Sequence, residues 1–222
     1  MDKVIIIGGK GSAIVVAEQI YDTQVKRGDV EFLGFAFDDD SKGNIINGFP
    51  ILCKTYEAHK KYDKYDDIKF IYQLYRPDLM KERIDLLNSF QIEKEKFYTF
   101  VHHTATVSRS AKIGNGTVIM ANVVVNPNTV IGNHCTIHSN TLIGHDTRIG
   151  DNNFVAAHNV VGSSSEIGNA NFFGLNSTFN NYLKIGDYNF VGMASNVVKN
   201  INSNQKVYGN PAKEFYKDIK PL

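Results

Sequence analysis

The sequence has few cysteines, almost no net charge and no long hydrophobic run, and each shortage argues against a class of protein. Its two cysteines, Cys53 and Cys135, fall in different regions, which disfavours a disulfide framework or a thiolate metal site. The formal net charge is +1, so nothing indicates nucleic-acid binding. The apolar run at residues 4–7 is too short to span a bilayer and lacks a small-residue cleavage site. We therefore expect a cytoplasmic protein without membrane insertion.

What the sequence does contain is an apolar residue at every sixth position from residue 101 to residue 197. The series is Val101, Val107, Ile113, Ile119, Val125, Ile131, Ile137, Ile143, Ile149, Val155, Val161, Ile167, Phe173, Phe179, Ile185, Val191 and Val197. Glycine often follows the apolar residue, and the fifth place of the unit is often small. Neither a helix nor an ordinary strand has a period of six.

A fixed short repeat predicts a solenoid, in which each unit buries its apolar edge by stacking on the next. Three hexapeptides would form one triangular coil of 18 residues, with the aliphatic side chains pointing inward. The glycines would suit corners, where a tight turn can require positive φ. A series of unrelated β-hairpins would not keep one register over this length. The sequence therefore predicts a β-helix, with a C-terminal tail, over residues 99–222.

The segment before the repeats reads as an α/β domain over residues 1–98. A predicted strand at residues 3–7 leads through a glycine turn to a predicted helix at 14–21. Gly9, Lys10, Gly11 and Ser12 belong to this turn, where backbone N–H groups can approach a phosphate closely. Ile14 stands where a dinucleotide fingerprint has a third small residue, so a turn that only packs strand against helix is the alternative.

The rest of this domain supplies two candidate carboxylates. A predicted strand at 30–37 ends at Asp38 and Asp39, which can accept hydrogen bonds from a ribose or a base. A solvated acidic turn explains them equally well. Further strands are predicted at 48–52 and 69–74, and a helix is predicted at 77–90.

The order of motifs resembles a known family. The motifs are a Gly-Gly-x-Gly-x-Ala turn at 8–13, Gly-Phe-Ala-Phe-Asp-Asp at 34–39, Gly-Phe-Pro at 48–50, Val-His-x-x-Ala at 101–105, Ile-Gly-His-Asp at 143–146 and Gly-Asn-Pro-Ala-Lys at 209–213. Together they resemble bacterial hexapeptide-repeat acetyltransferases that modify nucleotide-linked amino sugars, grouped with sialic-acid O-acyltransferases.

The resemblance implies a truncated Rossmann-like domain that holds a nucleotide-sugar. It also implies a left-handed β-helix that forms a homotrimer and binds acetyl-CoA between subunits. Two features depart from the family pattern. Ser12 occupies the place of a histidine that contacts the substrate in the family, and Tyr75-Arg76-Pro77 replaces a glycine-containing turn.

The candidate catalytic pair is His145 and Asp146, which match the family's catalytic histidine and carboxylate. Acetyl transfer from a thioester needs a base, because the attacking amine or hydroxyl must lose a proton, and imidazole serves this role near neutral pH. The aspartate would orient the ring and favour the imidazolium that forms. The pair occupies the third and fourth places of its hexapeptide, away from the inward positions.

Other residues are weaker candidates. On an 18-residue coil, His158 stacks between Asn140 and Asn176. This column either lines the groove beside His145, where it would polarise the substrate or the thioester, or is an outward polar ladder. The resemblance implies acetyl-CoA contacts for Phe154, His158, Leu175 and Met193, although these residues would also serve subunit packing. The role of His138 is open, whereas His102, His103 and His134 are interpreted as structural.

These observations predict direct N-acetylation of a UDP- or dTDP-linked 4-amino-4,6-dideoxy sugar, for surface polysaccharide or O-antigen synthesis. No residue is placed as a nucleophile, because Cys135 points inward and no serine adjoins His145. An O-acetyltransferase acting on a sugar or sialic-acid hydroxyl is the alternative. More remote alternatives are a trimeric zinc enzyme of the gamma carbonic anhydrase type and a non-catalytic scaffold. No metal is expected.

Overall fold

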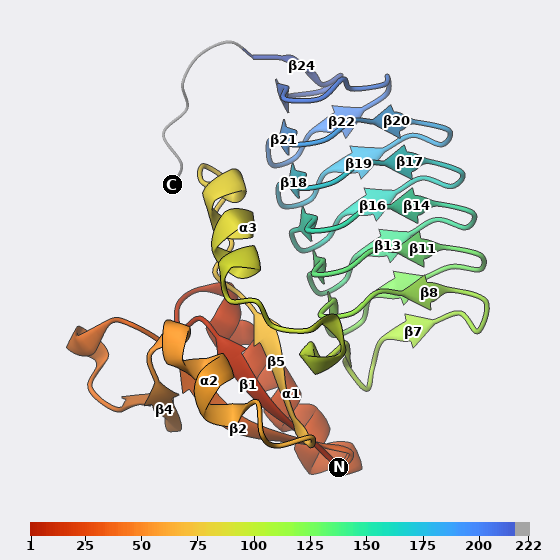
Figure 1. Ribbon diagram of the computed structural model, residues 1–222. Helices are drawn as coiled ribbons and strands as arrows, with labels where there is room; N and C mark the ends of the chain where they lie inside the picture. The colour runs from red at the N-terminus through yellow and green to blue at the C-terminus, as the bar shows by residue number, and fades with distance from the viewer. Residues whose placement is uncertain (216–222) are drawn as a thin grey trace.

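The computed structural model describes residues 1–215, with only the backbone described at Lys42. The N-terminal α/β domain lies at one end of a stack of flat coils, which rises away from it towards the C-terminus (Figure 1). The last residues of the predicted second domain, 216–222, lie outside the described part. Within that part, no helix is long and apolar enough to cross a membrane.

A five-stranded sheet forms the centre of the N-terminal domain. Its order is β3-β4-β2-β1-β5, and β1 pairs in parallel with both β2 and β5. β4 continues in parallel on β2, whereas β3 is antiparallel to β4. The strands are β1 Asp2–Ile7, β2 Val30–Ala36, β3 Ile45–Ile46, β4 Phe49–Cys53 and β5 Ile68–Tyr72. Hydrophobic strands joined by helical crossovers produce this parallel arrangement.

Three α-helices and three short 3-10 helices complete the domain. They are α1 Ser12–Arg27, η1 Asp40–Lys42, η2 Thr55–Glu57, α2 Ala58–Tyr62, α3 Met80–Ser89 and η3 Lys94–Lys96. α1 buries Ala13, Val16, Ala17 and Ile20 against the sheet and ends at Gly28, which adopts the left-handed conformation. α1 is longer than the predicted helix at 14–21, and α3 starts three residues after the predicted Pro77. The sequence interpretation missed β3 and α2.

The β-helix consists of three parallel sheets whose strands are two or three residues long. The first sheet contains β6 Phe100–Val101, β9 Val118–Ile119, β12 Thr136–Ile137, β15 Phe154–Val155, β18 Phe172–Phe173, β21 Phe190–Val191, β23 Lys206–Tyr208 and the antiparallel β24 Lys213–Glu214. The second contains β7 Thr106–Val107, β10 Val124–Val125, β13 Leu142–Ile143, β16 Val160–Val161, β19 Thr178–Phe179 and β22 Asn196–Val197. The third contains β8 Lys112–Ile113, β11 Val130–Ile131, β14 Arg148–Ile149, β17 Glu166–Ile167 and β20 Lys184–Ile185.

The strand register confirms the predicted 18-residue coil. Val125 pairs with Ile143 and Ile143 with Val161, so equivalent residues of successive coils lie directly above one another. The apolar first-place residues from Ile119 to Val197 are buried and form one continuous core. This stacking of short apolar edges holds a solenoid together.

The corner glycines act through close approach rather than through positive φ. Positive φ falls instead on the fourth place of the hexapeptides from residue 116 to residue 194, as at Asn128, Asp146 and Ser164. A Cβ on Gly144 would lie 2.5 Å from the backbone nitrogen of Ser163 in the next coil. The expectation of positive φ at these glycines was therefore wrong, because the coils stack too closely there for a side chain.

Three corners separate the sheets, and we name each by a feature that it carries. The α1 corner comprises residues 102–104, 120–122, 138–140, 156–158, 174–176 and 192–194. The His145 corner comprises 108–110, 126–128, 144–146, 162–164 and 180–182, and the glycine corner comprises 114–116, 132–134, 150–152, 168–170 and 186–188. The α1 corner and the His145 corner flank the two edges of the second sheet.

The N-terminal domain packs against the first coils of the β-helix. Phe100, Val118 and Met120 join the apolar cluster of β1 and α1. Tyr75 donates hydrogen bonds from its hydroxyl to the carbonyl of His134 (3.0 Å) and to Asn152 Oδ1 (3.2 Å). Tyr75 therefore anchors the N-terminal domain to the β-helix.

Candidate active site

His145 and Asp146 form a hydrogen-bonded pair at the edge of the second sheet. Their Nδ1 and Oδ2 atoms lie 2.7 Å apart, and about half of each side chain is exposed. Asp146 has a φ of 56°, a conformation that aspartate tolerates, and this turns its carboxylate back towards the ring. With Nδ1–H donated to Asp146, Nε2 is left as the basic nitrogen.

Asn128, one coil earlier, holds the carboxylate. Its Nδ2 donates to Asp146 Oδ1 at 3.0 Å, and its own backbone N–H donates to the Ser110 hydroxyl. Hydrogen bonds from His145 and then from Asn128 hold the pKa of Asp146 below its usual value. The sequence interpretation missed Asn128, although the 18-residue period places it directly under Asp146.

The glycine turn opens onto a cleft at the N-terminus of α1. Gly11 is the N-cap of α1 with a φ of 53°, and a Cβ there would meet nothing. No side chain caps the helix and its first turn carries no acidic residue, so the positive end of the helix dipole is suited to an anion. The cleft measures about 380 Å³ and is lined by Gly9, Lys10, Gly11, Ile14, Ile45, Ile46 and Asn47.

The two carboxylates at the end of β2 have different surroundings. Asp39 forms an ion pair with Lys10 at 2.6 Å, and hydrogen bonds from Lys10 and then Ser41 lower the pKa of its carboxyl. Asp38 instead accepts hydrogen bonds from the backbone N–H and the hydroxyl of Thr55, at 2.8 and 2.6 Å. Asp39 is therefore linked to the glycine turn by its ion pair with Lys10. Both carboxylate oxygens of Asp38 instead accept hydrogen bonds from Thr55.

α1 runs along the α1 corner, with its N-terminus nearest the upper coils. Near its C-terminal end, Arg27 donates to the carbonyl of His103 (2.9 Å). Gln19 bonds both Ala121 and Ser139, one and two coils higher. Ser12, the first helical residue, reaches His138. The N-terminus of α1 therefore lies below the next residues of the same corner, which include His158, Leu175 and Met193.

The residues expected to contact acetyl-CoA occupy this corner and the adjoining sheet. Leu175 and Met193 are 50% and 62% exposed, an unusual position for large apolar side chains. His158 Nε2 lies 3.4 Å from Asn140 Nδ2, which agrees with the predicted stacking. Within one chain the column is not beside His145 as predicted, because the two lie at corners on opposite edges of the second sheet. Phe154 instead lies in β15 and stacks on Phe172 at 5.2 Å between ring centroids.

The candidate catalytic and ligand-binding residues do not converge within one chain. His145 lies on the His145 corner, whereas the glycine turn, His158, Leu175 and Met193 adjoin the α1 corner, across the second sheet. In one chain, His145 and the cleft therefore lie at opposite edges of the second sheet.

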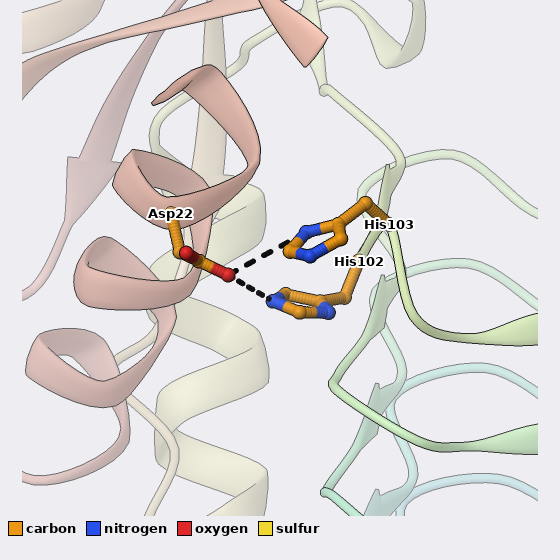
Figure 2. Close-up of side chains that lie close together, drawn as sticks. All are labelled: Asp22, His102 and His103. Carbon is orange, nitrogen blue, oxygen red and sulfur yellow. Dashed lines mark ion pairs between the residues drawn. The ribbon is translucent and has the colours of Figure 1, made fainter. Parts of the chain in front are cut away.

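A separate cluster joins α1 to the first coil. Figure 2 shows His102 and His103 directed at the Asp22 carboxylate, with Oδ2 at 3.3 Å from Nε2 of His102 and 3.5 Å from Nδ1 of His103. These three residues are the group within the described chain with the spacing of metal ligands. The backbone N–H of Thr104 donates to His102 Nδ1, so the ring proton is on Nε2 and is donated to Asp22. The cluster acts as a hydrogen-bonded contact between the domains.

The remaining histidines of the coils are dispersed. His134 is partly buried and packs against Phe97 at the glycine corner, and desolvation of the ring lowers its pKa to about 4. His138 and His158 lie on the α1 corner, and His145 lies on the corner named after it, so the histidines occupy all three corners. Cys135 is buried inside the coil, and burial raises the pKa of its thiol to about 12, a state unsuited to a nucleophile.

Comparison with known proteins supports the fold. A family model described as bacterial transferase hexapeptide (six repeats) matches residues 110–145. No curated protein sequence matches the chain.

Several solved structures resemble the chain over its whole length. A variant of perosamine N-acetyltransferase from Caulobacter crescentus, in complex with CoA and GDP-perosamine, has a TM-score of 0.82 at 21% identity and covers 98% of both chains. The acetyltransferase domain of PglB from Neisseria gonorrhoeae, in complex with acetyl coenzyme A, has a TM-score of 0.82 at 22% identity, covering 96% of this chain and 98% of that domain. WeeI from Acinetobacter baumannii matches with a TM-score of 0.64 at 17% identity, covering 97% of this chain and 100% of that one. The predicted Rossmann-like domain followed by a left-handed β-helix is thus confirmed.

Proposed function

We propose that this protein is an acetyl-CoA-dependent N-acetyltransferase that acts on a nucleotide-linked amino sugar. The observation that carries the proposal is the exposed His145–Asp146 pair, whose imidazole is oriented through Nδ1 with Nε2 left to accept a proton. The proteins of similar fold bound to GDP-perosamine, CoA or acetyl-CoA support the substrate class. For the nucleotide sugar itself, we propose a UDP- or dTDP-linked 4-amino-4,6-dideoxy sugar.

The chemistry is direct transfer. The acceptor amine attacks the thioester carbonyl of acetyl-CoA, so that a C–N bond forms as the C–S bond breaks. Nε2 of His145 takes the proton that the amine loses, and the departing CoA thiolate takes it in turn. Asp146 stabilises the imidazolium while Asn128 keeps the carboxylate aligned. With Cys135 buried in the coil, we propose no acetyl-enzyme.

The glycine turn would hold the nucleotide. Its backbone N–H groups and the N-terminus of α1 are suited to the diphosphate, and the adjoining cleft offers apolar walls at Ile14, Ile45 and Ile46 for a base. Above it, exposed Leu175 and Met193 are suited to the pantetheine arm of acetyl-CoA. The acceptor and the thioester would therefore meet beside the α1 corner.

We propose a homotrimer in which the second sheet of each chain faces the threefold axis. This face exposes Leu142 and Val160 at 36% and 45%, whereas the third sheet presents Arg148, Glu166 and Lys184. With three such faces around one axis, the His145 corner of each chain meets the α1 corner of its neighbour. Because His145 and His138 belong to one coil, the catalytic pair would lie level with the neighbour's glycine turn.

The test is acetyl transfer by the His145→Ala variant. General-base catalysis contributes about 10²–10⁴-fold, so we expect kcat to fall by roughly that factor while affinity for the nucleotide-sugar is retained. Asp146→Asn should cost less, because the ring remains in place. CoA release would be followed with a panel of nucleotide-linked amino sugars and their hydroxyl analogues. Full kcat in His145→Ala, or acetylated protein after incubation with acetyl-CoA alone, would contradict the mechanism.

A further inference from the structure

An imidazole from the β-helix reaches the glycine turn of the other domain. His138 Nε2 lies 3.3 Å from the hydroxyl of Ser12, although the two residues are 126 positions apart in the sequence. Ser12 is the first residue of α1 and directly follows Gly11, which lines the cleft. The contact therefore crosses the seam between the domains at the place where the proposed nucleotide-sugar enters.

The hydrogen bonds around Ser12 define which nitrogen of His138 carries the proton. The Ser12 hydroxyl donates to Gln73 Oε1 at 2.9 Å, and Gln73 Nε2 donates to the hydroxyl of Thr136 at 2.9 Å. With its own proton committed to Gln73, the Ser12 oxygen acts as acceptor towards His138 Nε2–H. The proton is thus on Nε2, and Nδ1 keeps a lone pair.

That lone pair is open to a ligand. Nδ1 of His138 has no partner among the hydrogen bonds of the described residues, and it is also not one of the buried polar atoms that lack partners. Burial of the ring lowers its pKa to about 4, so the imidazole is neutral at ordinary pH. The Phe154 ring, 4.8 Å away between centroids, holds the imidazole from the next coil.

We propose that His138 is an acceptor-binding residue, whose Nδ1 accepts a hydrogen bond from the sugar of the nucleotide-linked substrate. This inference rests on the proposed function and deepens it. The β-helix thus supplies an imidazole beside the glycine turn. His145, across the subunit interface, remains the base, and His138 sets the position of the sugar between the turn and the thioester.

The test exchanges the two side chains. His138→Ser removes the imidazole, and we expect the KM for the nucleotide-sugar to rise about tenfold, the worth of one hydrogen bond, with the KM for acetyl-CoA unchanged. The double variant Ser12→His, His138→Ser returns an imidazole from the opposite wall and should recover most of that loss. Calorimetric binding should show the same pattern for UDP- or dTDP-linked 4-amino-4,6-dideoxy sugar, with unchanged affinity for UDP or dTDP alone.

Thr136→Val is the matched control, because it breaks the Gln73 contact in the same seam and leaves the imidazole in place. Its acceptor KM should equal that of the parent. An unchanged KM in His138→Ser would overturn the inference, as would an equal rise in Thr136→Val, since the seam alone would then be responsible. Neither of these two results would contradict the proposed function, because the parent protein would still transfer acetyl groups. A parent that binds nucleotide-sugar without any turnover would overturn the proposed function and keep the assignment of His138, provided that His138→Ser weakens that binding.

Discussion

The histidines of this protein differ in exposure and in pKa because their surroundings differ. His145 is exposed and paired with Asp146, whereas His134 and His138 are largely enclosed, and burial lowers both of their pKa values to about 4. Residue type and spacing identified the exposed pair. The enclosed histidines owe their state to Phe97 and to the N-terminal domain, which no local pattern specifies.

The enclosed histidines predict a pH dependence of stability. Their folded pKa values lie below the unfolded value of about 6.5, so the unfolded chain binds more protons as the pH falls below that value. The free energy of unfolding should therefore fall between pH 6.5 and 5, above the range where carboxylates titrate. Each histidine contributes at most about 1.4 kcal/mol per pH unit.

Urea denaturation at several pH values measures this slope. His134→Asn is a suitable variant, because asparagine is common at the equivalent left-handed position of other coils, as at Asn128 and Asn152. Its slope should be shallower than that of the parent. Equal slopes in the two proteins would show that His134 does not stay neutral in the fold.

At the scale of elements, the glycine corner is held by a ladder of side-chain hydrogen bonds. The third-place side chain of each coil accepts a hydrogen bond from the backbone N–H of the equivalent residue one coil below, as Asn169 Oδ1 does from Asp151 at 2.8 Å. Further rungs join Asn115 to Asn133 and Asp187 to the Ser203 hydroxyl. The glycines at the second place leave room for these side chains.

Removal of one rung should destabilise the β-helix. Asn169→Leu leaves the Asp151 N–H without its acceptor, and we expect a loss of about 1–3 kcal/mol in the free energy of unfolding. Asn169→Ser keeps an accepting oxygen at this place, as Ser203 does at the rung above Asp187, and should cost less. Chemical denaturation of both variants makes the comparison, and equal losses would assign the effect to packing instead of the hydrogen bond.

At the scale of the whole molecule, the proposed site needs two chains. This predicts that two inactive variants complement each other. Lys10→Glu reverses the charge at the turn that we expect to face the diphosphate, and His145→Ala removes the base. A mixed trimer would contain one interface with both groups intact, so random mixing should restore about a quarter of the parent activity. Activity of mixtures refolded together measures this.

A further change at the proposed interface provides the control. Val160→Asp on the second sheet, introduced into both variants, should prevent assembly and abolish the recovered activity. Lys112→Asp on the third sheet should leave it intact, because that face is expected to meet solvent. A site shared between chains would be contradicted if the protein sedimented as a monomer and were still active. It would also be contradicted if the mixtures recovered no activity.

The sequence by itself determined the β-helix, because each hexapeptide carries its own inward residue and neighbouring coils repeat the same local contacts. It also determined the central strands β1, β2 and β5, whose apolar runs are continuous. His145 and Asp146 were predicted as a pair because they lie together within one repeat, and a hydrogen bond joins them in the structure. The bounds of the short elements and the reason for the corner glycines were missed, since both depend on neighbouring coils or chain segments.

Only the tertiary structure decided how the two domains meet. The contacts of Ser12 with His138 and of Tyr75 with His134 join residues far apart in the chain, and no periodicity encodes them. They follow from α1 packing along one particular corner, which directs its N-terminus towards the upper coils. The repeat placed His145 and Asp146 together on one corner of the β-helix, because both lie within one hexapeptide. Side-chain packing between the domains decided that the cleft adjoins a different corner, and the site that we propose across the second sheet follows from that packing.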